Sequence, residues 1–90
     1  MDNVNRVKRT TLDGLLTPPR WGGKHTDVRN LKKGFPAPIS ATKEGQRLMD
    51  DAIKELINDG WLLAKKSTGQ IRVSLKPRMK KEIMEFVNDA

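Results

Sequence analysis

The sequence predicts an α+β fold, in which a long amphipathic helix is followed directly by a β-hairpin. The helix is expected at residues 42–59, because apolar side chains recur there at three- and four-residue intervals. These residues are Leu48, Met49, Ala52, Ile53, Leu56 and Ile57. Beyond Gly60 the apolar period changes to about two, which is typical of a β-strand. There Ile71, Val73 and Leu75 alternate with Arg72, Ser74 and Lys76.

The residues at the ends of the long helix favour these bounds. Thr42 or Ser40 can accept hydrogen bonds from the free N–H groups of the first turn, and Glu44 is favoured at the positive end of the helix dipole. Gly60 can adopt the left-handed conformation that ends a helix. The hairpin is expected to turn at residues 67–69, and its alternating polar side chains are expected to face water or a ligand.

The sequence predicts little regular structure in the N-terminal part of the chain. Residues 1–11 indicate a flexible basic arm ahead of a single domain at residues 12–90. The arm either becomes ordered on a nucleic-acid backbone or in a minor groove, or has no role. A short helix is expected at residues 11–16, ended by Pro18 and Pro19. Trp21 follows in a turn, and we expect it to cap the core, with stacking on a nucleic-acid base as the alternative.

Two further short helices are expected on either side of the long helix. Residues 26–33 predict one of them, with Thr26 as its N-cap. Residues 35–39 contain two prolines and are expected to form a non-helical connector. Pro77 can begin a C-terminal helix, whose apolar face carries Met79, Ile83, Phe86 and Val87. That face either docks on its own domain or pairs with a second chain, so a homodimer through this helix remains open.

Positive charge is concentrated around the hairpin. The 90-residue chain has a formal net charge of +7, and residues 61–81 contain seven basic and no acidic side chains. Residues 34–60 instead contain three basic and five acidic side chains. A basic surface attracts polyanions, because each neutralised phosphate releases condensed counterions. Nucleic acid is therefore the favoured partner, although Lys and Arg can also simply keep a small domain soluble.

Composition argues against an enzyme or a membrane protein. A chain with 36% hydrophobic residues has a modest core and little room for a substrate cavity, and without cysteine it has no thiolate site. His25, the single histidine, has no obvious metal-binding partners nearby. We expect no catalytic residues, metal or cofactor. Because the N-terminus is polar and no segment has about 18 successive apolar residues, we expect a soluble cytoplasmic protein.

The run DAIKELINDGWLLAKKSTGQIRVSLKP at residues 51–77 resembles the winged-helix superfamily, in particular its small stand-alone archaeal and bacterial members. The resemblance covers less than a third of the chain. It implies a winged helix, a three-helix core with a C-terminal two-stranded β-hairpin wing, to which this chain adds a C-terminal helix. Members of the superfamily bind DNA, as in transcription regulation, bind RNA, or mediate contacts between proteins, so the resemblance does not choose between these functions.

In the pattern of that superfamily, the helix at residues 42–59 is the recognition helix and places its first half in the major groove. Asp50 and Asp51 would repel phosphates there, and an ordinary solvated face with Asp50 paired to Lys54 is the alternative. The wing would contact the phosphate backbone. The expected nucleic-acid-binding residues are Lys43, Gln46, Arg47, Lys65, Lys66, Arg72, Lys76, Arg78, Lys80 and Lys81.

The sequence is therefore compatible with two functions. The first is nucleic-acid binding, of DNA more than RNA, dominated by the backbone and with limited groove readout. The alternative is a protein-interaction or assembly module that has the same fold and makes no nucleic-acid contact. The acidic side chains of the long helix favour that alternative, because they oppose phosphates.

Overall fold

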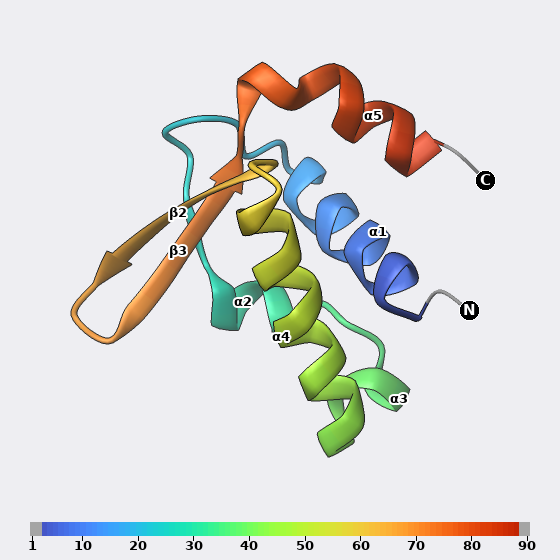
Figure 1. Ribbon diagram of the computed structural model, residues 1–90. Helices are drawn as coiled ribbons and strands as arrows, with labels where there is room; N and C mark the ends of the chain where they lie inside the picture. The colour runs from blue at the N-terminus through green and yellow to red at the C-terminus, as the bar shows by residue number, and fades with distance from the viewer. Residues whose placement is uncertain (1–2, 89–90) are drawn as a thin grey trace.

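The computed structural model describes residues 3–88 and has an α+β architecture (Figure 1). This part of the chain contains five α-helices and one three-stranded antiparallel sheet, which confirms the predicted class. The elements are α1 (Asn3–Leu16), β1 (Thr26–Asp27), α2 (Val28–Lys33), α3 (Ala37–Ser40), α4 (Lys43–Asn58), β2 (Leu62–Ser67), β3 (Gln70–Leu75), the 3₁₀ turn η1 (Pro77–Met79) and α5 (Lys80–Asn88). Among the helices at residues 3–88, none has the length and apolar character needed to cross a membrane.

Helix α1 replaces most of the flexible arm predicted at residues 1–11. It begins at Asn3, and its side chains Val7, Leu12 and Leu15 are buried. Thr11 is also fully buried, because its Oγ1 donates a hydrogen bond to the carbonyl oxygen of Val7 at 2.8 Å. A threonine that bonds within its own helix can occupy an apolar stripe, so the stripe continues across the boundary that was expected at residue 11. Residues 1 and 2 lie outside the described part of the chain.

Helix α4 is the long helix that the sequence predicts, and it packs against α1 (Figure 1). Thr42 is its N-cap, and the backbone N–H of Gly45 donates to Thr42 Oγ1 at 2.9 Å. Its last turn is followed by Gly60, whose φ is +80°. The stripe predicted from spacing is buried at Met49, Ala52, Ile53 and Leu56. The predicted start, apolar face and end of this helix are therefore all confirmed.

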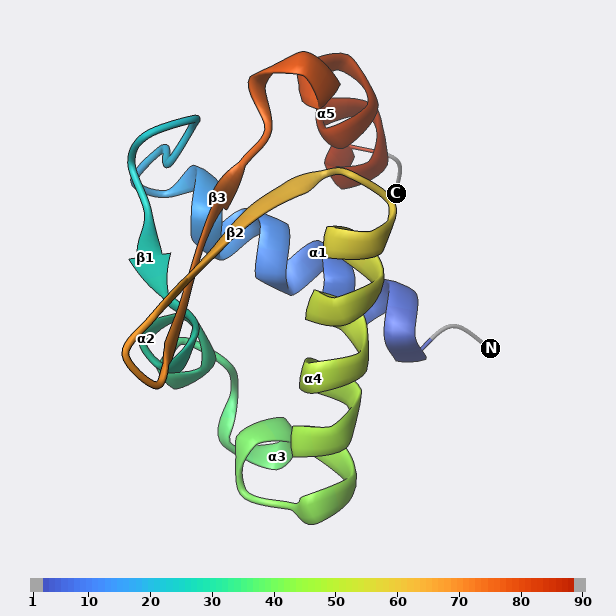
Figure 2. The ribbon, with the colours of Figure 1, turned by 60° about the vertical axis from the view of Figure 1, so that its left-hand side comes forward.

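The short helix α3 lies against the first turn of α4, where a connector without helix was predicted (Figure 2). Pro36 is its N-cap and Pro38 lies in its first turn, where a missing N–H leaves no helical hydrogen bond unmade. The two backbones are so close that a Cβ at Gly45 would lie 1.8 Å from the carbonyl oxygen of Ile39. The contact therefore requires glycine at position 45.

The sheet has the order β1-β3-β2, with β3 at its centre. The predicted hairpin is confirmed, and its turn places Thr68 and Gly69 at φ values of 30° and 75°. Strand β1 was expected to be the start of a helix. Helix α2 instead begins at Val28, because Asp27 rather than Thr26 is the N-cap and accepts a hydrogen bond from the backbone N–H of Arg29 at 2.8 Å.

Residues 20–22 cover one end of β3, which changes the role of Ser74. The backbone N–H of Leu75 donates to the carbonyl oxygen of Arg20 at 2.7 Å. The backbone N–H of Gly22 donates to the carbonyl oxygen of Leu75 at 2.9 Å. Ser74 Oγ donates to the carbonyl oxygen of Gly22 at 2.6 Å and is fully buried. The prediction that Ser74 faces water or a ligand is therefore wrong. Alternation separates the two faces of a strand, but it does not show that a loop covers the polar face.

Helix α5 docks on its own domain. Ile83 is fully buried in the larger core cluster, together with Leu12 and Leu56. Phe86 packs edge-on against Trp61, with ring centroids 5.5 Å apart. Of the two alternatives for the apolar face of α5, the structure shows the intramolecular one. A homodimer through the same face would have to displace this packing.

The close approach of α3 and α4 predicts that Gly45→Ala destabilises the fold by about 1–3 kcal/mol, since the new methyl group meets backbone atoms. In thermal unfolding followed by circular dichroism, Tm should fall by about 4 °C or more. Gly23→Ala is the matched control, because a Cβ at that position meets nothing within 4 Å. A Gly45→Ala variant as stable as this control would contradict the packing of α3.

Candidate nucleic-acid interface

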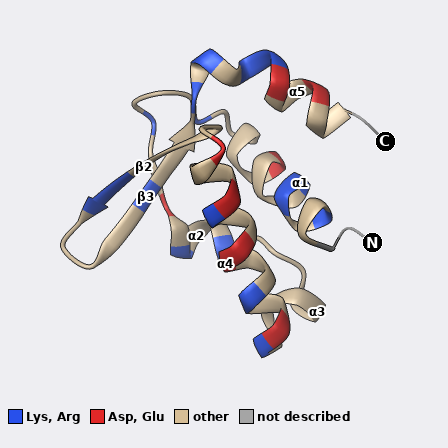
Figure 3. Cartoon of the chain, viewed as in Figure 1, with Lys and Arg blue, Asp and Glu red and all other residues tan. Residues whose placement is uncertain are grey.

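The ten predicted binding residues lie in three separate parts of the molecule (Figure 3). The first half of α4 carries Lys43, Gln46 and Arg47, and the hairpin carries Lys65, Lys66 and Arg72. The segment from the end of β3 into α5 carries Lys76, Arg78, Lys80 and Lys81. Figures 1 and 2 place the start of α5 and the start of α4 at opposite ends of the molecule, with the hairpin projecting between them. The structure thus does not gather the ten residues into one patch.

The hairpin presents cations on both of its faces. Lys65 is paired directly with Arg72, so these two side chains share one face, whereas Lys66 is paired with Ile71 on the other face. All three basic side chains are exposed. Within the described residues, none of them forms a salt bridge. The hairpin therefore presents three exposed cations on a ribbon that contains no acidic residue.

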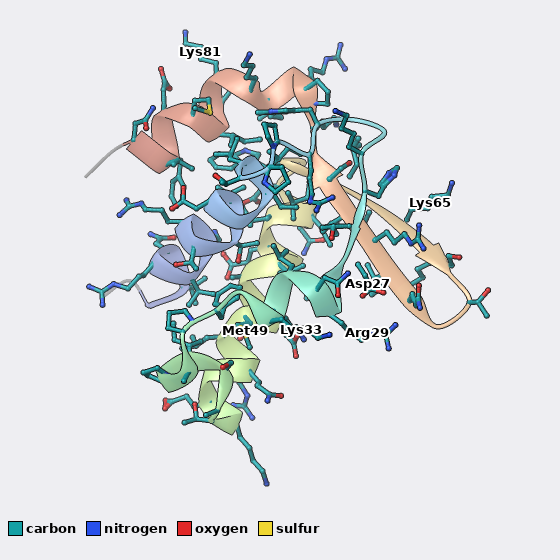
Figure 4. The ribbon with its side chains drawn as sticks, turned by 180° about the vertical axis from the view of Figure 1, so that it is seen from behind. Asp27, Arg29, Lys33, Met49, Lys65 and Lys81 are labelled. Carbon is teal, nitrogen blue, oxygen red and sulfur yellow. The ribbon has the colours of Figure 1, made fainter. Side chains whose placement is uncertain are left out.

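Asp27 lies beside this positive face, because β1 pairs it with Arg72. Its Oδ1 accepts hydrogen bonds from the backbone N and Nε of Arg29 at 2.8 and 3.4 Å, and its Oδ2 accepts from Nη2 at 3.2 Å (Figure 4). These bonds from Arg29 lower the pKa of Asp27, with a smaller contribution from the charge of Arg72. The negative charge of Asp27 is thus compensated mainly by Arg29.

Two acidic side chains of α4 are paired with cations from other helices. Lys32 Nζ of α2 binds Asp50 Oδ1, and Lys8 Nζ of α1 lies 2.8 Å from Glu55 Oε1. The partner of Asp50 is therefore Lys32, rather than the Lys54 considered from sequence. Because Lys32 compensates Asp50, the repulsion that Asp50 exerts on a phosphate is weaker than the sequence alone indicates.

The first half of α4 has fewer free groups for a groove than expected. Gln46 Nε2 donates to the carbonyl oxygen of Ser40 at 3.1 Å, so this amide binds the end of α3. Lys43 and Arg47 are exposed and form no salt bridge within residues 3–88. Two cations thus remain, and the amide of Gln46, a group that can pair with adenine, is engaged within the fold.

The basic residues around η1 and α5 have partly structural roles. Lys80 Nζ lies 6.0 Å from the centroid of the Trp21 ring, which fits a cation–π contact and the predicted capping role of Trp21. Lys76 Nζ approaches Gly60, just beyond the C-terminal end of α4, where the helix dipole favours a cation. Arg78 and Lys81 are exposed. Figure 4 shows Lys81 and Lys65 on widely separated parts of the surface.

A polar hollow beside the hairpin was missed by sequence reasoning. We call it the β1-side hollow; it has a volume of about 390 Å³, and every side chain that lines it is polar. Its lining residues are Arg20, His25, Thr26, Asp27, Asn30, Gln70 and Arg72. They come together because β1 pairs with β3. A two-residue strand has no periodicity that a sequence pattern could reveal.

Comparison with protein-family models, with curated proteins and with solved structures found no match for this chain. Across the described range 3–88, no group of three or more acidic or histidine side chains is placed to hold a metal ion. The candidate interface therefore consists of the exposed cations of the hairpin, the two free cations of α4 and the β1-side hollow.

The contacts of Asp27 predict how its pKa responds to mutation. Arg29→Gln should raise the pKa of Asp27 towards its ordinary value of 3.8, because the largest cause of the lowering is removed. Since the folded-state pKa is the lower one, Asp27 stabilises the fold above pH 3.8, and this contribution disappears as the pH falls through the folded-state value. NMR titration of the side-chain carboxyl carbon measures the pKa. Lys24→Gln is the control, and an unchanged pKa in Arg29→Gln would contradict the pairing.

Proposed function

We propose that this chain is a winged-helix domain that binds nucleic acid, DNA in preference to RNA, mainly through the phosphate backbone. The observation that carries the proposal is the hairpin, which presents Lys65, Lys66 and Arg72 exposed and without salt bridges in the described structure. No acidic residue occurs between Gly60 and Lys81. Such a ribbon can approach phosphates without carrying a carboxylate of its own towards them.

The arrangement of elements supports the winged-helix part of the proposal. Helices α1, α2 and α4 surround a common core, and α4 runs through Gly60 into the β2–β3 hairpin. This is the order that the resemblance of residues 51–77 implies. The added α5 covers the core next to Trp61. Helix α3 and strand β1 are additions to the predicted plan, and neither interrupts the path from α4 to the wing.

The charges on α4 favour backbone contact over base recognition. Lys43 and Arg47 can add phosphate or groove contacts in its first turns, but Gln46 is bound to Ser40. Asp51 is exposed and has no salt bridge in the described residues. A helix with two free cations, Glu44 between them and Asp51 after them supports one short contact. We therefore propose modest sequence specificity, since phosphate contacts position a protein and base contacts specify the sequence.

A protein-interaction module is the second candidate, and one surface feature favours it. An open hollow of about 820 Å³ lies along α5 and is lined by Trp61, Met84 and Phe86 together with charged residues. Half-buried aromatic and methionine side chains are typical of protein interfaces. Sedimentation at several concentrations, with and without an oligonucleotide, distinguishes the candidates. A monomer at all concentrations would remove self-assembly.

Backbone binding predicts a strong salt dependence for the affinity of duplex DNA. If about six phosphates are contacted, log K should fall with log salt at a slope near −5. Replacing Lys65, Lys66 and Arg72 together by Gln should reduce the magnitude of that slope by about 2.7, at about 0.9 per phosphate contact. Fluorescence anisotropy with a random-sequence duplex at several salt concentrations provides the measurement.

The control for this prediction removes the same charge elsewhere. Arg6, Lys33 and Lys54 are exposed and lie outside the hairpin, and their triple Gln variant should keep most of the slope. The proposal fails if wild-type affinity is already weak at low salt or does not change as salt rises. Equal losses in the two triple variants would show that net charge, rather than the hairpin, determines binding.

A further inference from the structure

We propose that the β1-side hollow is a binding site for a phosphate-type oxyanion, which shares Arg72 with the exposed cations of the wing. Its two arginines come from distant parts of the sequence, Arg20 from the loop after α1 and Arg72 from the central strand β3. The site does not depend on groove contacts by α4. It extends the candidate interface from the hairpin to Arg20 and the residues around β1.

Backbone hydrogen bonds and strand pairing fix the main chain of both arginines. The N–H of Arg20 donates to the carbonyl oxygen of Leu15 at 2.8 Å, and its own carbonyl oxygen accepts from Leu75 at 2.7 Å. Arg72 is paired with Asp27 on one side and Lys65 on the other. Groups that are positioned before a ligand arrives lose less conformational freedom when they bind it.

The charges lining the hollow favour an anion. Asp27 is the one carboxylate among the lining residues, and both of its oxygens already accept hydrogen bonds from Arg29. Neither Arg20 nor Arg72 forms a salt bridge within residues 3–88. Two arginines thus line a space whose single carboxylate is bound by Arg29. The hollow therefore has positive charge available to a ligand.

The chemistry of the lining selects phosphate. A guanidinium group can donate two parallel hydrogen bonds to phosphate oxygens. Thr26, Asn30 and Gln70 add hydroxyl and amide donors around the same space. No apolar side chain lines it, and the imidazole of His25 is its one aromatic ring, so it offers little stacking surface to a nucleobase. The phosphate can belong to a nucleic-acid backbone, which would continue from Lys65 and Arg72, or to a free phosphate compound.

Titration of the ¹⁵N-labelled chain with pyrophosphate tests the site. Saturable shifts are expected at the amides of Arg20, His25, Gln70 and Arg72. Arg20→Gln should raise the dissociation constant about tenfold, because a charge-assisted hydrogen bond is lost. Lys24→Gln is the control, since Lys24 is exposed and does not line the hollow. Shifts centred on α5, or equal affinities for Arg20→Gln and this control, would overturn the proposal.

A second variant tests the same charges in the opposite direction. Asp27→Asn removes the carboxylate but keeps an oxygen that can cap α2, so pyrophosphate should bind more tightly than to the wild type. If the NMR spectrum of Arg20→Gln shows that the wild-type fold is lost, Arg72→Gln is used in its place. Unchanged or weaker binding by Asp27→Asn would contradict the role assigned to the two free guanidinium groups.

A competition experiment separates the two sources of phosphate. If duplex DNA displaces pyrophosphate, the hollow accepts the nucleic-acid backbone; if both bind together, it accepts a free phosphate compound. Either result requires pyrophosphate binding at Arg20 and so supports the site. Failure of the hollow is distinguishable from failure of the wing. Binding of pyrophosphate without binding of duplex DNA would contradict the proposed function and support the hollow as a site. Binding of duplex DNA without binding of pyrophosphate would contradict the hollow alone.

Discussion

The pairing of β3 along both of its edges is the constraint on which the rest of the structure depends. One edge bonds to β2 and the other to β1, while the loop at residues 20–22 follows the end of the strand. Ser74 and Gly22 form a hydrogen bond in this covered region, and a buried polar group without its partner would cost about 1–3 kcal/mol. On the opposite face, Val73 and Leu75 join the core that contains α1, α4 and α5. The central strand thereby ties the N-terminal helix to the hairpin.

The same framework determines where positive charge remains available. Lys8 and Lys32 neutralise carboxylates on α4, and Arg29 holds Asp27. The cations of the hairpin have no such partners within residues 3–88, and those of α5 lie at another end of the molecule. Net charge by segment is therefore an incomplete guide to function. What matters for a polyanion is which cations are left unpaired on a common surface, and here the hairpin and the β1-side hollow meet at Arg72.

The sequence predicts those elements whose signals are local. The stripe that includes Leu56, the cap at Thr42 and the strand at Val73 each have a signal within one segment, and the structure confirms these elements. Burial along that strand does not alternate, since Ile71 is exposed and Ser74 is buried. Strand β1, the burial of Ser74 and the Lys32–Asp50 pair depend on contacts between distant segments, so no local pattern reveals them. The β1-side hollow belongs to this second group. Its arginines were visible in the sequence, but their meeting required the β1–β3 register.

Chemical-shift mapping of the ¹⁵N-labelled chain with random-sequence duplex DNA at low salt tests the central claim most directly. That claim is that β3 places Lys65 and Arg72 of the hairpin on one surface with Arg20 from the loop between α1 and β1. The account predicts perturbed amides at residues 64–74 together with Arg20 and His25, and weaker changes at Lys43. Perturbations confined to residues 43–47 or to α5, with the hairpin unaffected, would contradict it.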